Sequence, residues 1–468
     1  MPSAKPRAAK SHSEQSLDKN DPREIFGWKM YDWANSAFST TIVGALYGPY
    51  LTELTQRAVG ENGVVFNLEP MGAITAKSFF PTCVSVAVFL QIFLLPILGS
   101  VADYSNLKKK LMAVFCYIGV ATTCLMFYVS GNLYWLGGLL FIVANLAFGA
   151  AVVFYNGFLN DITTEDQRDK VSSRGFAYGY LGGGLLLALN FLLVKNAARF
   201  GLDPYTAVRI SLLSAGVWWG GFALVTFARL KARASAKSLP PGKTYLTVGF
   251  GELGRTFREL ARLRHTLKYL VGYLFFNDGI QTVISMASVF MAQELFISRG
   301  LETDQSFLLL IFLMVQFVAI FGALIFERLA YAIKTKNAIL VSLVLWSAVV
   351  IYGYGFLRTT RDAWIMGVVI AIVLGGSQAL SRSLFSRMIP RGREASFFGL
   401  YEVSERGTSW LGPLLFGAVV AMTNSYRQAL LSLIVLFIVG TVILYLTDTD
   451  QAIHEAGNLL PEEAAANK

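Results

Sequence analysis

Polar residues that could bind a solute lie inside a long apolar stretch, residues 28–54. Asp32, Asn35 and Ser36 fall in its first third. A charged side chain near the centre of a bilayer costs roughly 2.5 to 3.5 kcal/mol on insertion scales, so it normally faces a bundle interior or a water-filled cavity. We therefore expect these three side chains to line a polar cavity.

A second segment with a similar pattern lies much later in the chain. Residues 275–284, FFNDGIQTVI, align with residues 33–42, WANSAFSTTI. The alignment places Asn277 over Asn35 and sets Asp278 beside them. Two matching polar segments in apolar helices predict two related halves around one cavity.

The two segments supply different chemistry. Asn35, Asn277 and Gln281 are candidate ligands, because amides both donate and accept hydrogen bonds toward a zwitterion. Asp278 is the candidate coupling residue, because a buried carboxylic acid can exchange a proton within the physiological range. The alternative for Asp278 is a structural polar network between helices. Asp32 has a second interpretation, an interfacial position beside Trp28 and Lys29.

The composition is that of a polytopic helical membrane protein. The 468 residues are 54% hydrophobic and 15% charged, with a mean hydropathy of +0.52. Such values are too apolar for a soluble globular protein. The apolar runs suit α-helices that cross about 30 Å of hydrocarbon. In a soluble protein, a net charge of +10 would suggest binding to nucleic acid. Here the basic residues lie mostly in short connections between apolar runs, so their positions indicate which side of the membrane each connection occupies. We expect the lipid bilayer as a partner and no nucleic acid.

The order of apolar runs predicts an all-α protein with twelve transmembrane helices. Residues 55–77 are expected to form an external loop, residues 157–173 a charged connection, and residues 395–422 a continuous helix. The predicted segments are an N-terminal tail (1–27), a six-helix bundle (28–228), a linker with a basic amphipathic segment (229–265), a second six-helix bundle (266–447) and a C-terminal tail (448–468).

The distribution of lysine and arginine predicts the orientation. With both termini in the cytoplasm, most of these residues fall on the inner side, as the positive-inside rule requires. We expect a multi-pass protein of the cell (inner) membrane, and nothing in the sequence requires more than a monomer. Cys83, Cys116 and Cys124 lie in apolar stretches at spacings that suit neither a disulfide framework nor a zinc site, so we interpret them as core residues.

A second internal match indicates how the halves are related. VSSRG at 171–175 resembles VSERG at 403–407, and each stretch enters the fifth helix of its half. With the first match, this favours parallel six-plus-six repeats related by an axis along the membrane normal. Parallel halves, twelve spans and a long central linker are typical of the major facilitator architecture.

The loop after the second helix, GSVADYSNLKKK, resembles the signature loop of the major facilitator superfamily. Gly99, Asp103, Lys108 and Lys109 match it, and the resemblance implies that they close an inner gate. An aspartate there can accept hydrogen bonds from a neighbouring helix N-terminus, while lysines hold the loop at the headgroups. Asn106 stands where glycine is usual. The alternative is an ordinary positively charged inner loop.

Further charged residues near the inner helix ends complete the predicted gate. Glu402 and Arg406 are spaced to pair within one helix. A gating salt bridge from this helix to Arg174 or Arg382 is the functional interpretation, and a local pair at the membrane surface is the alternative. The predicted set is Asp161, Arg174, Arg382, Glu402, Glu405 and Arg406.

Several polar strings give a closer resemblance. They are YDWANSAFSTTI, NDITTEDQRDKVSSRGFAYGYLGGGLLL, YLFFNDGIQTVI and the run from GGSQALSRSLFSRMIP to YEVSERGTSWLGP. They resemble a bacterial branch of the major facilitators related to the fungal vacuolar amino-acid effluxer of autophagy, over about residues 25–447. The resemblance implies a secondary transporter that exports amino acids or another small polar metabolite, with the proton as a possible coupling ion.

Other classes of function have less support in the sequence. His12, His265 and His454 lack a second ligand at helical spacing, and we find no nucleophile or phosphate motif, so we expect neither an enzyme nor a cofactor. One alternative is a non-transporting membrane receptor or regulator on the same fold. Another is an exporter of a lipid or a drug, which would need a more apolar cavity than the paired amides suggest.

Overall fold

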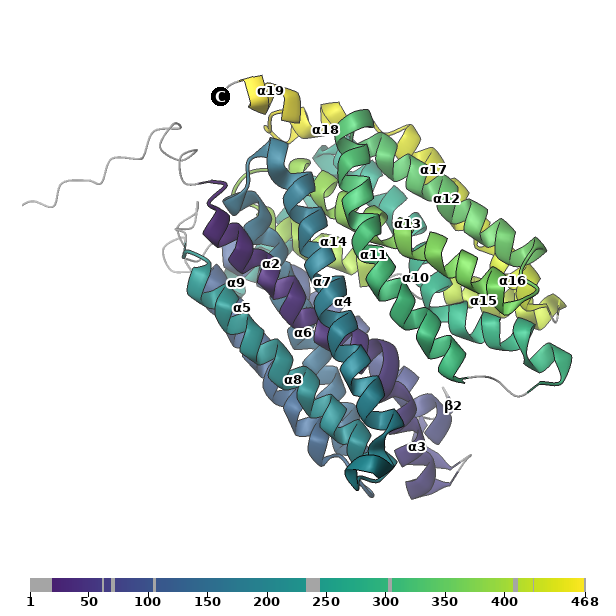
Figure 1. Ribbon diagram of the computed structural model, residues 1–468. Helices are drawn as coiled ribbons and strands as arrows, with labels where there is room; N and C mark the ends of the chain where they lie inside the picture. The colour runs from purple at the N-terminus through teal and green to yellow at the C-terminus, as the bar shows by residue number, and fades with distance from the viewer. Residues whose placement is uncertain are drawn as a thin grey trace, which may run out of the picture.

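A computed structural model describes residues 19–60, 63–68, 72–103, 107–232, 245–301, 305–406, 411–423 and 425–466. Almost all of this chain is helical (Figure 1). Each half has an apolar core of its own. In the N-terminal half this core includes the fully buried Trp28 and Trp219, and in the C-terminal half it includes Trp346. Large apolar side chains such as Phe89 are exposed on the outside of the bundle, where lipid would cover them.

The first crossing starts at Pro22, after the N-cap that Asp21-Pro22 predicts, runs beyond the predicted end at residue 54, and is not uniform. It consists of α2 (Pro22–Ala37), the π-helix η1 (Phe38–Leu46) and α3 (Tyr47–Val59). Asp21 caps α2 by accepting a hydrogen bond from the backbone of Arg23, and proline occupies the first helical position, where its missing N–H costs nothing. The helix therefore begins six residues before position 28.

The remaining helices of the first half follow in antiparallel order. The connection predicted over 157–173 is wrong in extent, because the fourth crossing runs on to Ile162 and the fifth begins at Arg168, with only the short η3 (Glu165–Gln167) between them. The helices are α4 (Ala76–Asp103), α5 (Lys108–Leu125) with η2 (Met126–Tyr128), α6 (Tyr134–Ile162), α7 (Arg168–Lys195), η4 (Ala197–Phe200) and α8 (Pro204–Arg229).

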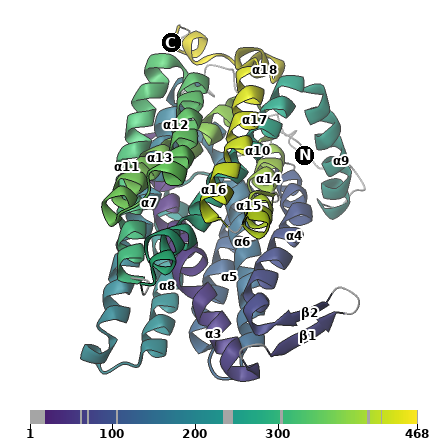
Figure 2. The same cartoon turned by 90° about the vertical axis from the view of Figure 1, so that its right-hand side faces the viewer.

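The predicted external loop over 55–77 contains a β-hairpin. Strands β1 (Val64–Leu68) and β2 (Gly72–Thr75) pair antiparallel, with Val64 opposite Thr75 and Leu68 opposite Gly72. Figure 2 shows the hairpin projecting beyond the helices. Valine and phenylalanine in β1 favour a strand, a local signal that the prediction of a plain loop overlooked.

The linker contains one helix, and the second half again consists of helices. The amphipathic segment forms α9 (Tyr245–Arg262), which packs against α4. The helices of the second half are α10 (Arg264–Leu295), η5 (Ile297–Arg299), α11 (Gln305–Ile333), α12 (Thr335–Gly355), α13 (Thr360–Arg387), α14 (Glu394–Arg406), α15 (Leu411–Thr423), α16 (Tyr426–Ser432), α17 (Ile434–Tyr445), α18 (Thr449–Glu455) and α19 (Pro461–Ala466). The described parts of the eleventh crossing are α14 and α15; residues 407–410 between them lie outside the described residues, so the continuous helix predicted over 395–422 stays a prediction.

Nine helices within the described ranges are long and apolar enough to cross a membrane, and α10, bent by 49°, adds a tenth. The first crossing, described as α2, η1 and α3, and the eleventh, of which α14 and α15 are described, are not among these helices. The start of α2 and the short helices α18 and α19 lie at one end of the bundle (Figure 1). We call this end the terminal face. The two halves meet along α7 with α11 and α13, and along α4 with α14.

Candidate functional site

Asp103 joins the two halves at the terminal face. It is the last residue of α4, is 5% exposed, and meets the first turn of α14. Its carboxylate accepts hydrogen bonds from the backbone N–H of Ala395 (3.1 Å) and of Ser396 (2.9 Å), and from the Ser396 hydroxyl (2.5 Å). The partial positive charge of a helix N-terminus stabilises an anion in this position. The contact with a neighbouring helix N-terminus is the one that the signature loop led us to expect, while its role as a gate stays a prediction.

Gly99 allows this contact by bringing two backbones together. A Cβ on Gly99 would lie 2.2 Å from the carbonyl oxygen of Ala395, which is backbone and cannot rotate away. The helices α4 and α14 can therefore approach closely enough for Asp103, one turn further on, to reach the α14 backbone. The spacing of glycine and aspartate in the sequence follows from this geometry.

Arg382 forms a second and deeper connection. Its guanidinium, buried in α13, lies 3.5 Å from the Oδ2 atom of Asp32 in α2, and Tyr155 donates its hydroxyl to the same oxygen at 2.6 Å. The guanidinium also lies over aromatic rings of the first half, 4.9 Å from the centre of Trp28 and 4.2 Å from that of Phe176. Cation–π contacts and one carboxylate thus stabilise the Arg382 guanidinium, whose burial without such partners would cost much free energy.

Further hydrogen bonds surround this ion pair. Arg382 donates to the Ser172 hydroxyl and to the Ser172 carbonyl, both at 2.9 Å. Ser172 donates in turn to the Ala379 carbonyl at 2.9 Å. Asn156 donates to Glu402 of α14 at 2.9 Å. Helices α6 and α7 of the first half are therefore bonded to α13 and α14 of the second.

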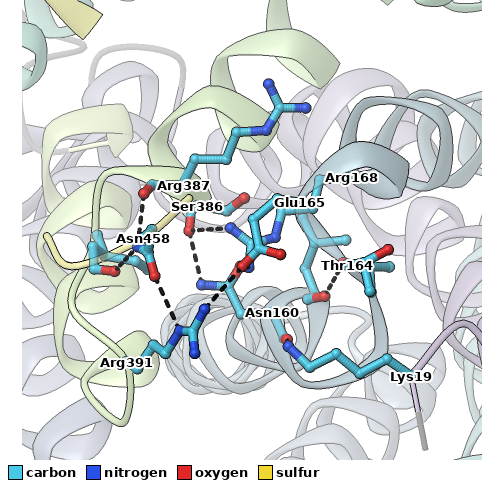
Figure 3. A network of polar contacts seen from close by, with 12 residues as sticks. Lys19, Asn160, Thr164, Glu165, Arg168, Ser386, Arg387, Arg391 and Asn458 are labelled. Carbon is cyan, nitrogen blue, oxygen red and sulfur yellow. Dashed lines mark hydrogen bonds and ion pairs between the residues drawn. The ribbon is translucent and has the colours of Figure 1, made fainter. Parts of the chain in front are cut away.

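A layer closer to the terminal face is shown in Figure 3. Ser386, near the end of α13, accepts two hydrogen bonds on its carbonyl oxygen, from Asn160 at 2.8 Å and from Arg168 at 3.1 Å. Glu165 pairs with Arg168 at 3.3 Å and with Arg391 of the second half at 3.5 Å. The end of α13 is thus bonded to both sides of the α6 to α7 connection.

The N-terminal segment reaches the same layer. Lys19 donates to the Asn160 carbonyl at 2.8 Å, at the end of α6 where the carbonyls lack helical partners. Asn20 exchanges hydrogen bonds with Thr164, donating to its hydroxyl and accepting from its backbone N–H. Burial, and then the charge of Arg168, lower the pKa of the Lys19 ammonium.

Two further connections link α7 with the region between α11 and α12. Asp169 pairs with Arg387 at 2.8 Å and accepts the hydroxyl of Thr335 at 2.7 Å. Arg174 pairs with Glu327 at 3.4 Å, but its side chain is 46% exposed, so this pair adds little to stability.

The lysines of the signature loop bond within their own half. Lys108 pairs with Asp161 at 3.0 Å, and Lys109 donates to the Leu230 carbonyl at the end of α8. They fix the α4 to α5 connection against α6 and α8. Lys108 also interacts electrostatically with Glu394 of α14 in the second half.

Arg174 pairs with Glu327 and Arg382 pairs with Asp32, while Glu402 accepts from Asn156. The predicted bridge from helix 11 to Arg174 or Arg382 stays a prediction. The position of the Arg406 side chain, and Asn106 altogether, lie outside the described residues. Of the predicted glutamates, Glu405 contacts the other polar segment through its backbone, whose carbonyl accepts from Asn277 at 3.1 Å.

Asp278 of α10 bonds α15 in the eleventh crossing. Its Oδ2 atom accepts from the backbone N–H of Gly412, in the first turn of α15, at 2.7 Å. Its Oδ1 atom is buried and has no hydrogen-bond partner among the residues that the structure describes. A buried acceptor without a partner is rare and calls for an explanation such as a proton or a ligand.

The other predicted ligands lie in two helices, Asn35 and Ser36 in α2, and Asn277 and Gln281 with Asp278 in α10. Asn35 is buried in α2, and Ser36 packs against α7 at Gly179. Gln281 is partly buried in α10. Asp32, predicted with this group, instead belongs with Arg382.

Sequence reasoning missed several residues that join the halves. All are polar, and seven of them lie in two strings already noted for the resemblance, NDITTEDQRDKVSS and SRSLFSRMIPRGRE, so the clustering of these seven near helix ends was an available signal. The residues are Tyr155, Asn156, Glu165, Arg168, Asp169, Ser172, Glu327, Thr335, Ser386, Arg387, Arg391 and Ser396.

Known proteins are similar in sequence to this chain over most of its length. The chain is 31% identical over 440 residues to the uncharacterized MFS-type transporter YxiO of Bacillus subtilis, covering 93% of this chain and 97% of that protein. It is 29% identical over 469 residues to autophagy-related protein 22 of Yarrowia lipolytica, covering 82% and 77%.

Solved structures share the fold at low sequence identity. The transporter FucP in its outward conformation matches with a TM-score of 0.64 at 11% identity, over 92% of this chain and 99% of that one. The proton:xylose symporter XylE also matches with a TM-score of 0.64, at 12% identity, over 98% and 100%. The fold is therefore that of the major facilitator superfamily, with twelve transmembrane helices in two parallel six-helix halves. The family model described as "Vacuole effluxer Atg22 like" matches residues 20–457, and this chain is a multi-pass membrane transporter that belongs to that family.

Proposed function

We propose that this transporter moves amino acids, or a similar small polar solute, out of the cell by alternating access. Residues 28–228 and 266–447 would move as two bodies around a central site. The observation that carries the proposal is the distribution of bonds between the halves. Among the described residues, the bonds that join the halves come from helix segments on the terminal side, from Asp103 with α14 to Arg382 with Asp32.

The orientation follows from charge. We assign the terminal face to the cytoplasm of the cell (inner) membrane, because the positive-inside rule favours lysine and arginine there. The bonded residues then form a closed inner gate, which must separate when the inner side opens. Export as the direction rests on the description of the family as effluxers.

The ion pair of Asp32 and Arg382 supports a zwitterionic solute. Their opposite charges lie 3.5 Å apart in a buried place, one on each half. An amino acid carries the same two charges, so its carboxylate can replace Asp32 at the guanidinium while its ammonium engages Asp32. Binding would then loosen the bond between the halves.

Asp278 is the proposed proton carrier. A proton on Oδ1, which has no partner within the described part of the chain, would satisfy that atom without breaking the bond from Gly412 to Oδ2. Asp278→Asn should abolish accumulation driven by a proton gradient while sparing solute exchange. Asp362→Asn, at an exposed helix cap in the same half, is the matched control. Unchanged proton-driven transport in the Asp278 variant would contradict the assignment.

Thermal unfolding tests the substrate class. Purified protein would be heated with amino acids, peptides, sugars and nucleosides at two pH values, beside the Asp278→Asn variant. A ligand at 100 times its Kd adds about 2.7 kcal/mol of apparent stability. Stabilisation by amino acids that disappears in Arg382→Gln would support the proposal. A shift with sugars or nucleosides alone would overturn it, and a shift with lipids would favour the lipid exporter.

A further inference from the structure

We propose that the C-terminal tail, residues 448–466, is a latch that holds the inner gate closed, and that Asn458 is its positioning residue. The inference rests on the alternating access proposed above. It adds a device outside the two bundles that sets the balance between the closed and open inner gate. In Figure 1 the tail helices α18 and α19 lie across the terminal face.

Asn458 fastens the connection between α13 and α14. It is 4% exposed. Its amide donates to the carbonyls of Arg387 and Ile389, each at 2.8 Å, and its oxygen accepts from Arg391 at 3.3 Å. The side chain thus uses both amide hydrogens and its oxygen within one short connection, as Figure 3 shows.

That connection in turn reaches the first half. Arg391, held by Asn458, pairs with Glu165 across the seam at 3.5 Å, and α19 contacts η3, which contains Glu165. Ser386, just before the same connection, accepts the two hydrogen bonds from Asn160 and Arg168. A tail that fixes residues 387–391 therefore fixes the partner surface for the first half.

The tail also walls a cavity that both halves share. This cavity of about 1100 Å³ has Asp169 and Lys170 of α7 on one side, and Asp450 and Ile453 of α18 on another. Separation of the halves at this face would change the walls of the cavity. The tail therefore lies where separation of the two halves would displace it.

The buried amide, and not the surface charges, carries the latch. Lys334 pairs with Asp450 and Glu462 at 3.5 Å, but all three side chains are at least 50% exposed. Exposed pairs contribute little, because water and salt screen them. The two donations of Asn458 to the carbonyls of Arg387 and Ile389 are buried, so their loss leaves buried acceptors unsatisfied, whereas the bond from Arg391 is only partly buried.

Labelling of a gate cysteine tests the latch without knowledge of the substrate. The reporter is Ser386→Cys in a background with the three native cysteines replaced by alanine, because Ser386 is buried in the gate and bonds the first half through its backbone. A membrane-impermeant maleimide is applied to the terminal face in inside-out vesicles. We expect Asn458→Ala to raise the labelling rate by a factor of roughly 5 to 30, the change that one or two kcal/mol produces.

Controls separate a latch from general loss of structure. Asn337→Ala removes an exposed asparagine at the wall of the same cavity and should leave the rate unchanged. Asn458→Asp keeps the size and the acceptor for Arg391 but loses both donations, and should raise the rate while the protein melts normally. If Asn458 acts through Arg391, the double variant with Arg391→Gln should label no faster than the faster single variant.

An unchanged labelling rate in folded Asn458→Ala and Asn458→Asp would overturn the latch. So would an equal rise in Asn337→Ala. Neither result would touch the proposed transport function, which the thermal-shift panel tests independently.

Discussion

Removal of the Asp103 carboxylate should open the inner gate. Asp103→Ala leaves the backbone N–H groups of Ala395 and Ser396, and the Ser396 hydroxyl, without their acceptor in the closed state. In an open state these groups meet water, so the variant loses stabilisation only where the gate is closed. The balance between the two states should therefore shift toward the open gate.

The magnitude follows from three hydrogen bonds to one carboxylate. Hydrogen bonds to charged groups contribute roughly 1.5 to 3 kcal/mol each, but burying the carboxylate, which is 5% exposed, offsets part of the sum. We take about 3 kcal/mol as the net difference, which is roughly a 150-fold change in the balance. Asp103→Asn keeps an acceptor oxygen and loses the charge, so it should fall between the wild type and Asp103→Ala.

The Ser386→Cys labelling assay measures this shift. Asp203→Ala provides the matched control, because Asp203 also accepts two backbone N–H groups at a helix N-terminus but lies in the exposed turn before α8, away from the seam. It should cost about 1 kcal/mol of stability without changing the labelling rate. Equal rates in Asp103→Ala and the wild type, with both proteins folded, would refute the reasoning that this contact holds the gate.

Three other changes have outcomes that the geometry decides. Gly99→Ala should open the seam as strongly as Asp103→Ala, because its Cβ would lie 2.2 Å from the Ala395 carbonyl, and normal labelling would contradict this. Gly412→Ala should lower the melting temperature, since its Cβ would lie 2.0 Å from a threonine hydroxyl of α10; an unchanged melting curve would show that the helices can move apart. Arg174→Ala should change stability by only about 0 to 1 kcal/mol, because its pair with Glu327 is partly exposed, and a large loss in melting would count against that estimate.

The sequence was informative where chemistry and spacing were local. Gly99 and Asp103 are one turn apart, and the resemblance of their loop to the signature loop, together with the affinity of a carboxylate for a helix N-terminus, predicted the contact. The identity of the helix could not be predicted, because α14 lies almost three hundred residues away in the chain, and only the packing of the halves brings it to α4. The β-hairpin was missed for a different reason, since a plain loop was assumed between two strong helices.

Pairing among buried charges was the least predictable feature. The sequence identified Arg382 and Asp32 as unusual, but assigned them to different sites and proposed helix 11 as the partner of the arginine. Several acidic residues were available, and the choice among them depends on distances set by helix packing. The aromatic rings of Trp28 and Phe176 that cover Arg382 come from two other helices, and no local pattern links them.

The sequence by itself determined that the chain is a membrane protein of twelve crossings in two related halves, because the length and apolarity of each helix are local properties that the bilayer fixes. It also determined which polar residues lie within those helices. Only the tertiary structure decided which of them meet, as Asp32 meets Arg382 and Asp278 meets the start of α15. Contacts between helices depend on the packing of side chains that are far apart in the chain. Hydropathy is a local property, so it does not predict that packing.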